Sequence, residues 1–167
     1  MTKAPFSTIL TPTQKNAESG IRKETAMTQA EIMEFINKNP VFTLATCADN
    51  VPHVRNMMVA FADKRGIIFS TGRNKDVCKQ ILANPSIEMC FYSPETEKQL
   101  RIAATAEETD DLELKKDIVE KFEFLKPWID TAGYDVLATF KLKNAKAIIW
   151  TMATNEKPKE YITITDL

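Results

Sequence analysis

Polar and apolar residues alternate along several short stretches of this chain, a pattern typical of strands with one buried face. β-Branched and aromatic residues gather in 41–47, 52–61 and 67–71, and turn-forming residues separate these stretches. Two further stretches, 86–92 and 99–107, have the same character. Short connections between successive strands favour an antiparallel sheet.

Two stretches in the first half have the spacing of amphipathic helices instead. The first begins at a capping box of Thr28 and Glu31 and ends before Pro40. The second runs from Lys75 to Ala83 and follows the third strand directly.

The second half predicts a surface helix and then more strands. Asp110 and Glu113 resemble a capping box at the start of a helix. The segment from Lys126 to Gly133 is expected to end this helix. Strands are expected at 136–142 and 145–152 with a turn at Lys143-Asn144, and 161–164 is a candidate edge strand. The apolar stripe of this helix is expected to be Leu114, Ile118, Phe122 and Leu125.

These elements organise into one domain. Residues 1–26 are polar with only scattered apolar positions and are expected to form a flexible tail, whereas residues 27–167 form a single domain. About seven strands with three inserted helices predict a mainly β (α+β) fold, either a barrel or a curled antiparallel sheet with helical connections.

Composition removes several function classes. Lys and Arg number 22 against 23 Asp and Glu, so no strong field favours a nucleic-acid partner. The chain has neither an apolar run of about 20 residues nor the apolar core of a signal peptide, so we expect no membrane partner and a cytoplasmic location. One histidine excludes a multi-histidine metal site. Three widely spaced cysteines predict reduced thiols: Cys47, Cys78 and Cys90.

The strand at 52–61 carries the sharpest candidate residue, Arg55. Period-two alternation places Arg55 on one face with Met57, Val59 and Phe61. A guanidinium beside apolar side chains needs an anionic ligand, an ion pair at a barrel rim, or solvent. The segment 70–75 ends a strand in small polar residues, where free N–H groups and a lysine favour phosphate. The two features together indicate a phosphorylated aromatic cofactor.

Three other side chains are weaker candidates. His53 is a candidate for acid–base catalysis because histidine is the residue type most often used for it, but a single histidine beside a turn proline is more often structural. Trp128 and Trp150 can each flank a planar ring, although Trp128 is the more typical core residue. No catalytic residue is assigned.

The ordered set of motifs resembles the FMN-binding split barrel of the pyridoxamine 5'-phosphate oxidase family. The resemblance runs from about Thr28 to Met152, and each motif alone is weak. The motifs that support the resemblance are Thr43–Thr46 with Pro52–Arg55, Phe69–Gly72 with Lys75, Asn84-Pro85, Lys98–Ile102 and Ile148–Trp150.

The resemblance implies a six-stranded antiparallel split β-barrel with peripheral helices, forming a homodimer whose FMN sites lie at the subunit interface. FMN is the implied cofactor, with haem, the deazaflavin F420 and FAD as alternatives. The residues implied to bind the cofactor are Arg55, Asn56, Met57, Met58, Ser70, Thr71, Asn74, Lys75, Gln99 and Trp150.

Departures from the family pattern shape the functional hypothesis. Ala60 stands where the true oxidases have a substrate-binding lysine, Ala103-Ala104 replaces a Glu-Gly pair, and 154–159 lacks a late arginine. We therefore expect an FMN-dependent oxidoreductase of the small, general-stress-like branch, acting on an unidentified small molecule and not on pyridoxamine 5'-phosphate. The alternative is a sensor or storage module that binds flavin, or haem through His53, without turnover.

Overall fold

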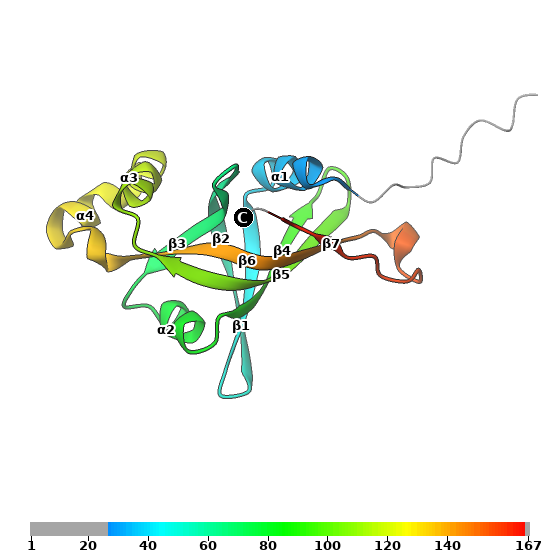
Figure 1. Cartoon of the computed structure of the whole chain (residues 1–167), viewed down its shortest axis with the longest axis horizontal. Helices are drawn as coiled ribbons and strands as arrows, with labels where there is room; N and C mark the ends of the chain where they lie inside the picture. The colour runs from blue at the N-terminus through cyan, green and yellow to red at the C-terminus, as the bar shows by residue number, and fades with distance from the viewer. Residues whose placement is uncertain (1–26, 166–167) are drawn as a thin grey trace, which may run out of the picture.

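The computed structural model describes residues 27–165, so the predicted tail at 1–26 lies outside the described residues. Its sheet has the strand order β3-β2-β1-β4-β5-β6-β7, and β3 also pairs with β6 (Figure 1). This second pairing closes six antiparallel strands into a barrel, which confirms the predicted fold. The strands are β1 (Val41–Ala48), β2 (Val51–Asp63), β3 (Gly66–Gly72), β4 (Ser86–Ser93), β5 (Lys98–Thr109), β6 (Leu137–Trp150) and β7 (Ile162–Thr163).

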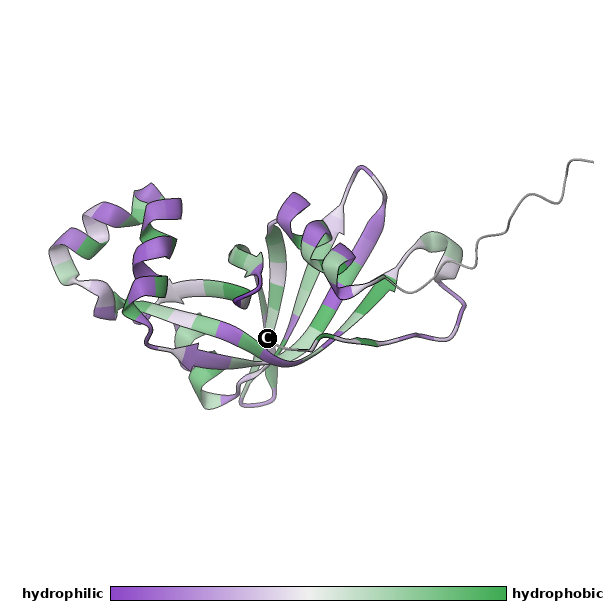
Figure 2. Cartoon of the chain, turned by 45° about the horizontal axis from the view of Figure 1, so that its top comes forward, coloured by the Kyte–Doolittle hydropathy of each residue, from purple (hydrophilic) through white to green (hydrophobic). Residues whose placement is uncertain are grey.

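Four phenylalanines from four strands fill the barrel interior. Phe42 lies with its ring centroid 5.8 Å from that of Phe69 and 5.3 Å from that of Phe91. Phe69 also stacks on Phe140 at 5.5 Å. Figure 2 shows hydrophobic and hydrophilic residues alternating along these strands, as half-buried strands require. Burying each ring contributes roughly 1.5–3 kcal/mol.

Helix α1 (Gln29–Lys38) begins where the sequence predicts. The Thr28 hydroxyl accepts a hydrogen bond from the Glu31 amide at 3.3 Å, and the Thr28 amide donates to the Glu31 carboxylate at 2.7 Å. The helix buries Ile32 and Ile36 against the barrel core. Helix α2 (Asp76–Ala83) follows β3, and Lys75 is its N-cap residue.

A β-bulge in β2 corrects the predicted face of Phe61. The β2–β3 register shifts between Val59 and Phe61, so Val59 packs in the barrel while Phe61 lies on its outer side. There the Arg65 guanidinium stacks 3.7 Å from the Phe61 ring centroid. Arg65 also bonds Asp117 at 2.8 Å, which ties the β2–β3 hairpin to helix α3 (Leu112–Lys121).

Helices α3 and α4 (Lys126–Ala132) cover a second apolar cluster outside the barrel. The predicted cap is wrong by one residue, because Asp111 accepts from the Leu114 amide while Asp110 pairs with the buried Lys115. The segment expected to break the helix is itself helical, because a proline in the first turn suits a helix start. Short 3-10 turns are η2 (Glu123–Leu125), η3 (Tyr134–Val136) and η4 (Met152–Thr154).

Strand β6 is continuous where a turn was expected at Lys143-Asn144. Asn144 has a φ of 53°, a conformation that asparagine tolerates, and β5 has a register shift between Ala103 and Thr105 opposite it. The positive φ therefore marks an irregularity in a ladder and not a hairpin. β7 pairs with β6 at Lys146 and confirms the predicted edge strand. No helix among residues 27–165 is long and apolar enough to cross a membrane.

Candidate functional site

The Arg55 guanidinium is held by two neutral side chains. Its Nη1 donates to the Thr46 hydroxyl at 2.7 Å, and its Nη2 donates to the side-chain oxygen Oε1 of Gln80 at 2.5 Å. Thr46 also donates to Gln80 at 2.7 Å. Since Thr46 belongs to β1 and Gln80 to α2, the network joins both elements to β2.

No carboxylate neutralises Arg55 within the described part of the chain. Partial burial lowers the pKa of its guanidinium from the ordinary value, yet an arginine keeps its charge at neutral pH. The predicted rim ion pair is therefore not what holds this side chain. A fixed positive charge with neutral partners is available to an anion.

A second cation lies where β3 turns into α2. The Lys75 ammonium forms no ion pair or hydrogen bond with residues 27–165. As N-cap, Lys75 supplies no side-chain acceptor to the first turn of α2, which leaves amides of that turn open to an anion.

Gly72 shapes this loop by lacking a side chain. A Cβ on Gly72 would lie 2.7 Å from Cη2 of Trp128 and 3.1 Å from Oδ1 of Asn74. The tryptophan ring thus packs directly on the loop that carries Lys75, in addition to contacting the second apolar cluster. The predicted core role of Trp128 is therefore incomplete, because the ring packs both against the apolar cluster and on this loop.

The remaining β3 candidates divide between the two faces of the strand. Thr71 is buried on the side of Phe69, inside the barrel, whereas Ser70 is half-buried on the outer side opposite Thr139. Strand alternation therefore allows only one of these hydroxyls to face any single surface.

The β2 candidates divide in the same way. Arg55 and Met57 pair across the ladder with the inward residues Leu44 and Phe42. Asn56 and Met58 point outward and are exposed, with Met58 at 46%. The structure does not bring these four consecutive side chains onto one surface.

Gln99 and Trp150 are direct cross-strand partners on β5 and β6. The Trp150 indole N–H donates to Asn155 at 3.0 Å. In the closed barrel, β5 is three strands from β2 in either direction, so Gln99 and Asn56 lie on opposite sides. Within one subunit, the candidate residues of β2, β3 and the start of α2 lie on one side of the barrel, and the pair Gln99 and Trp150 lies on the other.

Residues beyond the predicted set contribute to the site. Thr46 and Gln80 hold Arg55, and the signal for Thr46 was its inward position two residues after Leu44. Ala60, at the departure from the oxidase pattern, is 1% exposed, and its carbonyl accepts from Lys121 of α3. That position is closed to a ligand by the helix.

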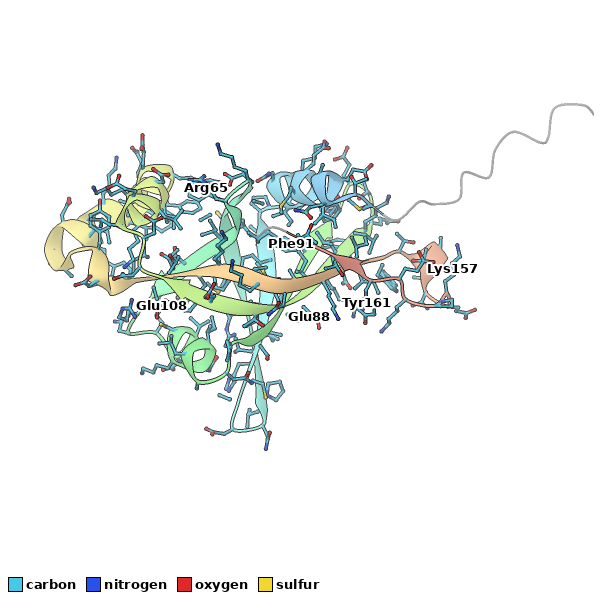
Figure 3. The ribbon with its side chains drawn as sticks, viewed as in Figure 1. Arg65, Glu88, Phe91, Glu108, Lys157 and Tyr161 are labelled. Atoms are coloured by element: carbon cyan, nitrogen blue, oxygen red, sulfur yellow. The ribbon has the colours of Figure 1, made fainter. Side chains whose placement is uncertain are left out.

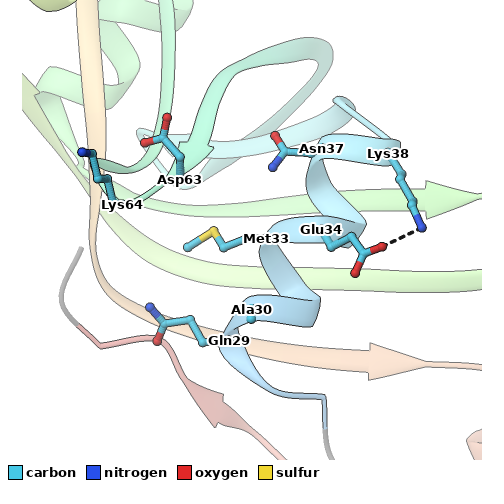
Figure 4. Close-up of a pocket in the computed structure, with 8 residues that line it drawn as sticks. All are labelled: Gln29, Ala30, Met33, Glu34, Asn37, Lys38, Asp63 and Lys64. Carbon is cyan, nitrogen blue, oxygen red and sulfur yellow. Dashed lines mark ion pairs between the residues drawn. The ribbon is translucent and has the colours of Figure 1, made fainter.

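A separate hollow of about 750 Å³ lies between α1 and the β2–β3 hairpin (Figure 4). Met33 points into it, and Asp63 and Lys64 form its far wall. None of the predicted cofactor residues lines this hollow.

Comparison with known proteins places the chain in a family. The sequence model described as pyridoxamine 5'-phosphate oxidase matches residues 28–144, more than half of the chain. The chain belongs to the pyridoxamine 5'-phosphate oxidase family. A pyridoxine/pyridoxamine 5'-phosphate oxidase from Psychrobacter cryohalolentis is 32% identical over 83 residues, covering 49% of this chain and 38% of the relative. The chain thus matches less than half the length of this curated family member.

Solved structures share the fold. A NimC/NimA family protein from Clostridium acetobutylicum superimposes with a TM-score of 0.68 at 20% identity, covering 81% of this chain and 92% of that one. General Stress Protein 26 from Bacillus anthracis gives 0.60 at 19%, covering 81% and 98%. A haem-binding protein from Mycobacterium smegmatis gives 0.61 at 15%, covering 82% and 58%. Proteins that share this fold therefore include a general stress protein and a haem-binding protein.

Replacing Thr46 by valine tests the network around Arg55. Thr46→Val removes an acceptor from the guanidinium and a donor from Gln80, and should lower the free energy of unfolding by about 1–3 kcal/mol. Urea denaturation measures this loss. Thr43→Val is the matched control, because Thr43 is exposed on the same strand and should change stability by less than about 0.5 kcal/mol. Equal losses in the two variants would show that the network is not stabilising.

Proposed function

We propose that this protein is a cytoplasmic flavoprotein that binds FMN as a homodimer and acts as an oxidoreductase on a small molecule. The observation that carries the proposal is the pair Arg55 and Lys75, two cations without an acidic partner among the described residues. Gln80 links the Arg55 side chain to α2, and Lys75 stands at the start of that helix. A phosphate is the ligand chemistry that suits this arrangement.

The ring of the cofactor needs residues that one subunit keeps apart. Asn56 and Met58 project from β2, whereas Gln99 and Trp150 project from the opposite side of the barrel. A second copy that packs the outer side of its β5–β6 pair beside β2 would supply the missing half. Homodimerisation is thus part of the proposed site and not an addition to it.

An exposed apolar surface supports this assembly. We define the outer face as the outward side chains of β2, β1, β4, β5 and β6. Large apolar residues on it are 46–69% exposed: Val41, Val54, Met58 and Tyr92. Val41 and Met58 are cross-strand partners, and exposed apolar side chains grouped on one face are typical of a protein interface.

The proposed phosphate contacts predict the affinities of two flavins. Arg55→Ala with Lys75→Ala should weaken FMN binding at least about 100-fold, because two charge-assisted contacts are lost. Riboflavin lacks the phosphate, so its affinity should change little and the preference for FMN should disappear. Titration by flavin fluorescence quenching measures both affinities.

Lys79→Ala is the control for that experiment, because Lys79 lies on the same helix but pairs with Asp76 at 3.2 Å. It should leave FMN affinity unchanged. Circular dichroism establishes that the double variant is folded. An unchanged FMN-to-riboflavin preference in the folded double variant would reject the phosphate assignment.

The proposed dimer is tested by placing charge on the outer face. Tyr92 is 52% exposed on β4 next to Gln99, and Tyr92→Glu should set two carboxylates into an apolar interface. Sedimentation velocity should then show a monomer, and FMN affinity should fall in parallel. Phe124→Glu is the control, because Phe124 is 76% exposed on η2, outside the outer face. A dimer that survives Tyr92→Glu with full FMN affinity contradicts the shared site.

Turnover separates an oxidoreductase from a binding module. When bound, the flavin supplies the redox chemistry, and the protein positions it and neutralises its phosphate. We expect NADH or NADPH to reduce the flavin-loaded protein in stopped-flow absorbance. The absence of reduction by either donor would favour a sensor or storage module.

Because a haem-binding protein shares the fold, haem binding is the alternative, and the same purified protein can be used to test it. His53 is the chain's one histidine and is half-buried on β2, two residues before Arg55. A haem module would show a Soret band that His53→Ala abolishes. Haem titration without such a band would retire this alternative.

A further inference from the structure

A small charged pocket lies on the outer face of β4, β5 and β6, under the segment that leads into β7. Its volume is about 150 Å³, roughly the share of five waters in the liquid. That space is large enough for a phosphate group. Seven residues line it: Glu88, Arg101, Ala103, Lys146, Ile148, Lys159 and Tyr161.

Sheet register explains how distant residues meet here. Glu88 pairs with Ala103, and Ala103 pairs with Lys146, so these three form one row across the sheet. Arg101 pairs with Ile148 in the adjacent row. Neither row depends on a loop for its position.

The pocket is completed by the chain just before β7. Thr163 pairs with Lys146, and this pairing anchors the segment that carries Lys159 and Tyr161 against the sheet. Figure 3 shows Glu88 and Tyr161 near the middle of the molecule and Lys157 further along the same connection. Lys157 does not line the pocket.

Charge in this pocket is unbalanced. Three cations, Arg101, Lys146 and Lys159, line it with one carboxylate, Glu88, which leaves a formal excess of two positive charges. Lys146 and Lys159 form no ion pair within residues 27–165.

The guanidinium of Arg101 is also incompletely bonded. Its Nε lies 3.7 Å from the Glu88 carboxylate, too far for a hydrogen bond, and is buried without a hydrogen-bond partner among the described residues. Glu88 approaches the Nε side, so the outer nitrogens of the guanidinium remain for another acceptor. An underbonded cation beside two unpaired lysines indicates a site for an anion.

We propose that this pocket binds the phosphate group of a small molecule as a second ligand site. A phosphate monoester has its second pKa near about 6 and carries close to two negative charges at neutral pH, which matches the excess charge. The site is distinct from the cations Arg55 and Lys75, and the proposal holds whether or not the protein binds flavin.

The pocket adjoins the Gln99–Trp150 pair. Arg101 and Ile148 lie two residues from that pair on the same face, about 7 Å along the strands. A phosphate held here would place the rest of its molecule beside those two side chains. The pocket thus places a cationic site on the outer face next to the Gln99 amide and the Trp150 indole.

Titration of the apo protein with inorganic phosphate at low salt tests the proposal. In two-dimensional NMR, the amide shifts of Arg101, Lys146 and Lys159 should change. These changes should occur at low phosphate concentration and should not depend on any shifts in 72–77. Lys146→Gln and Lys159→Gln should each weaken this binding by about tenfold, because each removes one charge-assisted contact. Acetate, with a single charge, should bind more weakly than phosphate.

Lys157→Gln is the matched control, since it removes an exposed lysine of the same segment that does not line the pocket. It should leave phosphate binding unchanged, and both pocket variants should keep the FMN affinity of the parent. Shifts confined to 72–77, or equal phosphate affinity in all three lysine variants, would overturn the proposal. So would a change of sedimentation in the pocket variants without phosphate binding, because the cations would then serve a subunit contact.

Discussion

Pairing of β3 with β6 is the constraint on which the other features depend. It converts a seven-stranded sheet into a barrel with an inside and an outside. The inside is filled by four phenylalanine rings in edge-on, tilted and stacked contact. Closure also sets β2 and β5 on opposite sides. A cofactor that needs residues from both strands therefore needs two subunits.

Neutral hydrogen-bond partners decide the character of Arg55. A carboxylate in place of Gln80 would cancel its charge and leave a structural ion pair. Thr46 and Gln80 instead fix the guanidinium without neutralising it, at some cost in desolvation. The same arrangement makes α2 part of the site, because Gln80 joins the helix to the barrel and Lys75 begins it. In the proposed phosphate site, one hydrogen-bond network would therefore serve both stability and ligand binding.

The outer face combines apolar and cationic regions with different roles. Its β2, β1 and β4 part presents exposed apolar side chains, which favour protein contact. Its β5 and β6 part carries the pocket around Arg101, where unpaired cations favour a small anion. Ala60 and α3 close the position that the oxidase pattern reserves for substrate.

The sequence by itself determined the strands β1 to β5, the first helix cap and Arg55 as the residue of interest, because alternation and capping are local patterns. The residue patterns left a barrel and a curled sheet open, and only the family resemblance implied the barrel. Tertiary structure decided the rest. The bulge that turns Phe61 outward, the unbroken course of β6 through Asn144 and the helical α4 depend on which ladders and clusters each segment joins. The partners of Arg55 and the pocket at Arg101 join residues far apart in the chain. Only strand register and closure bring such residues together, and no local pattern records either.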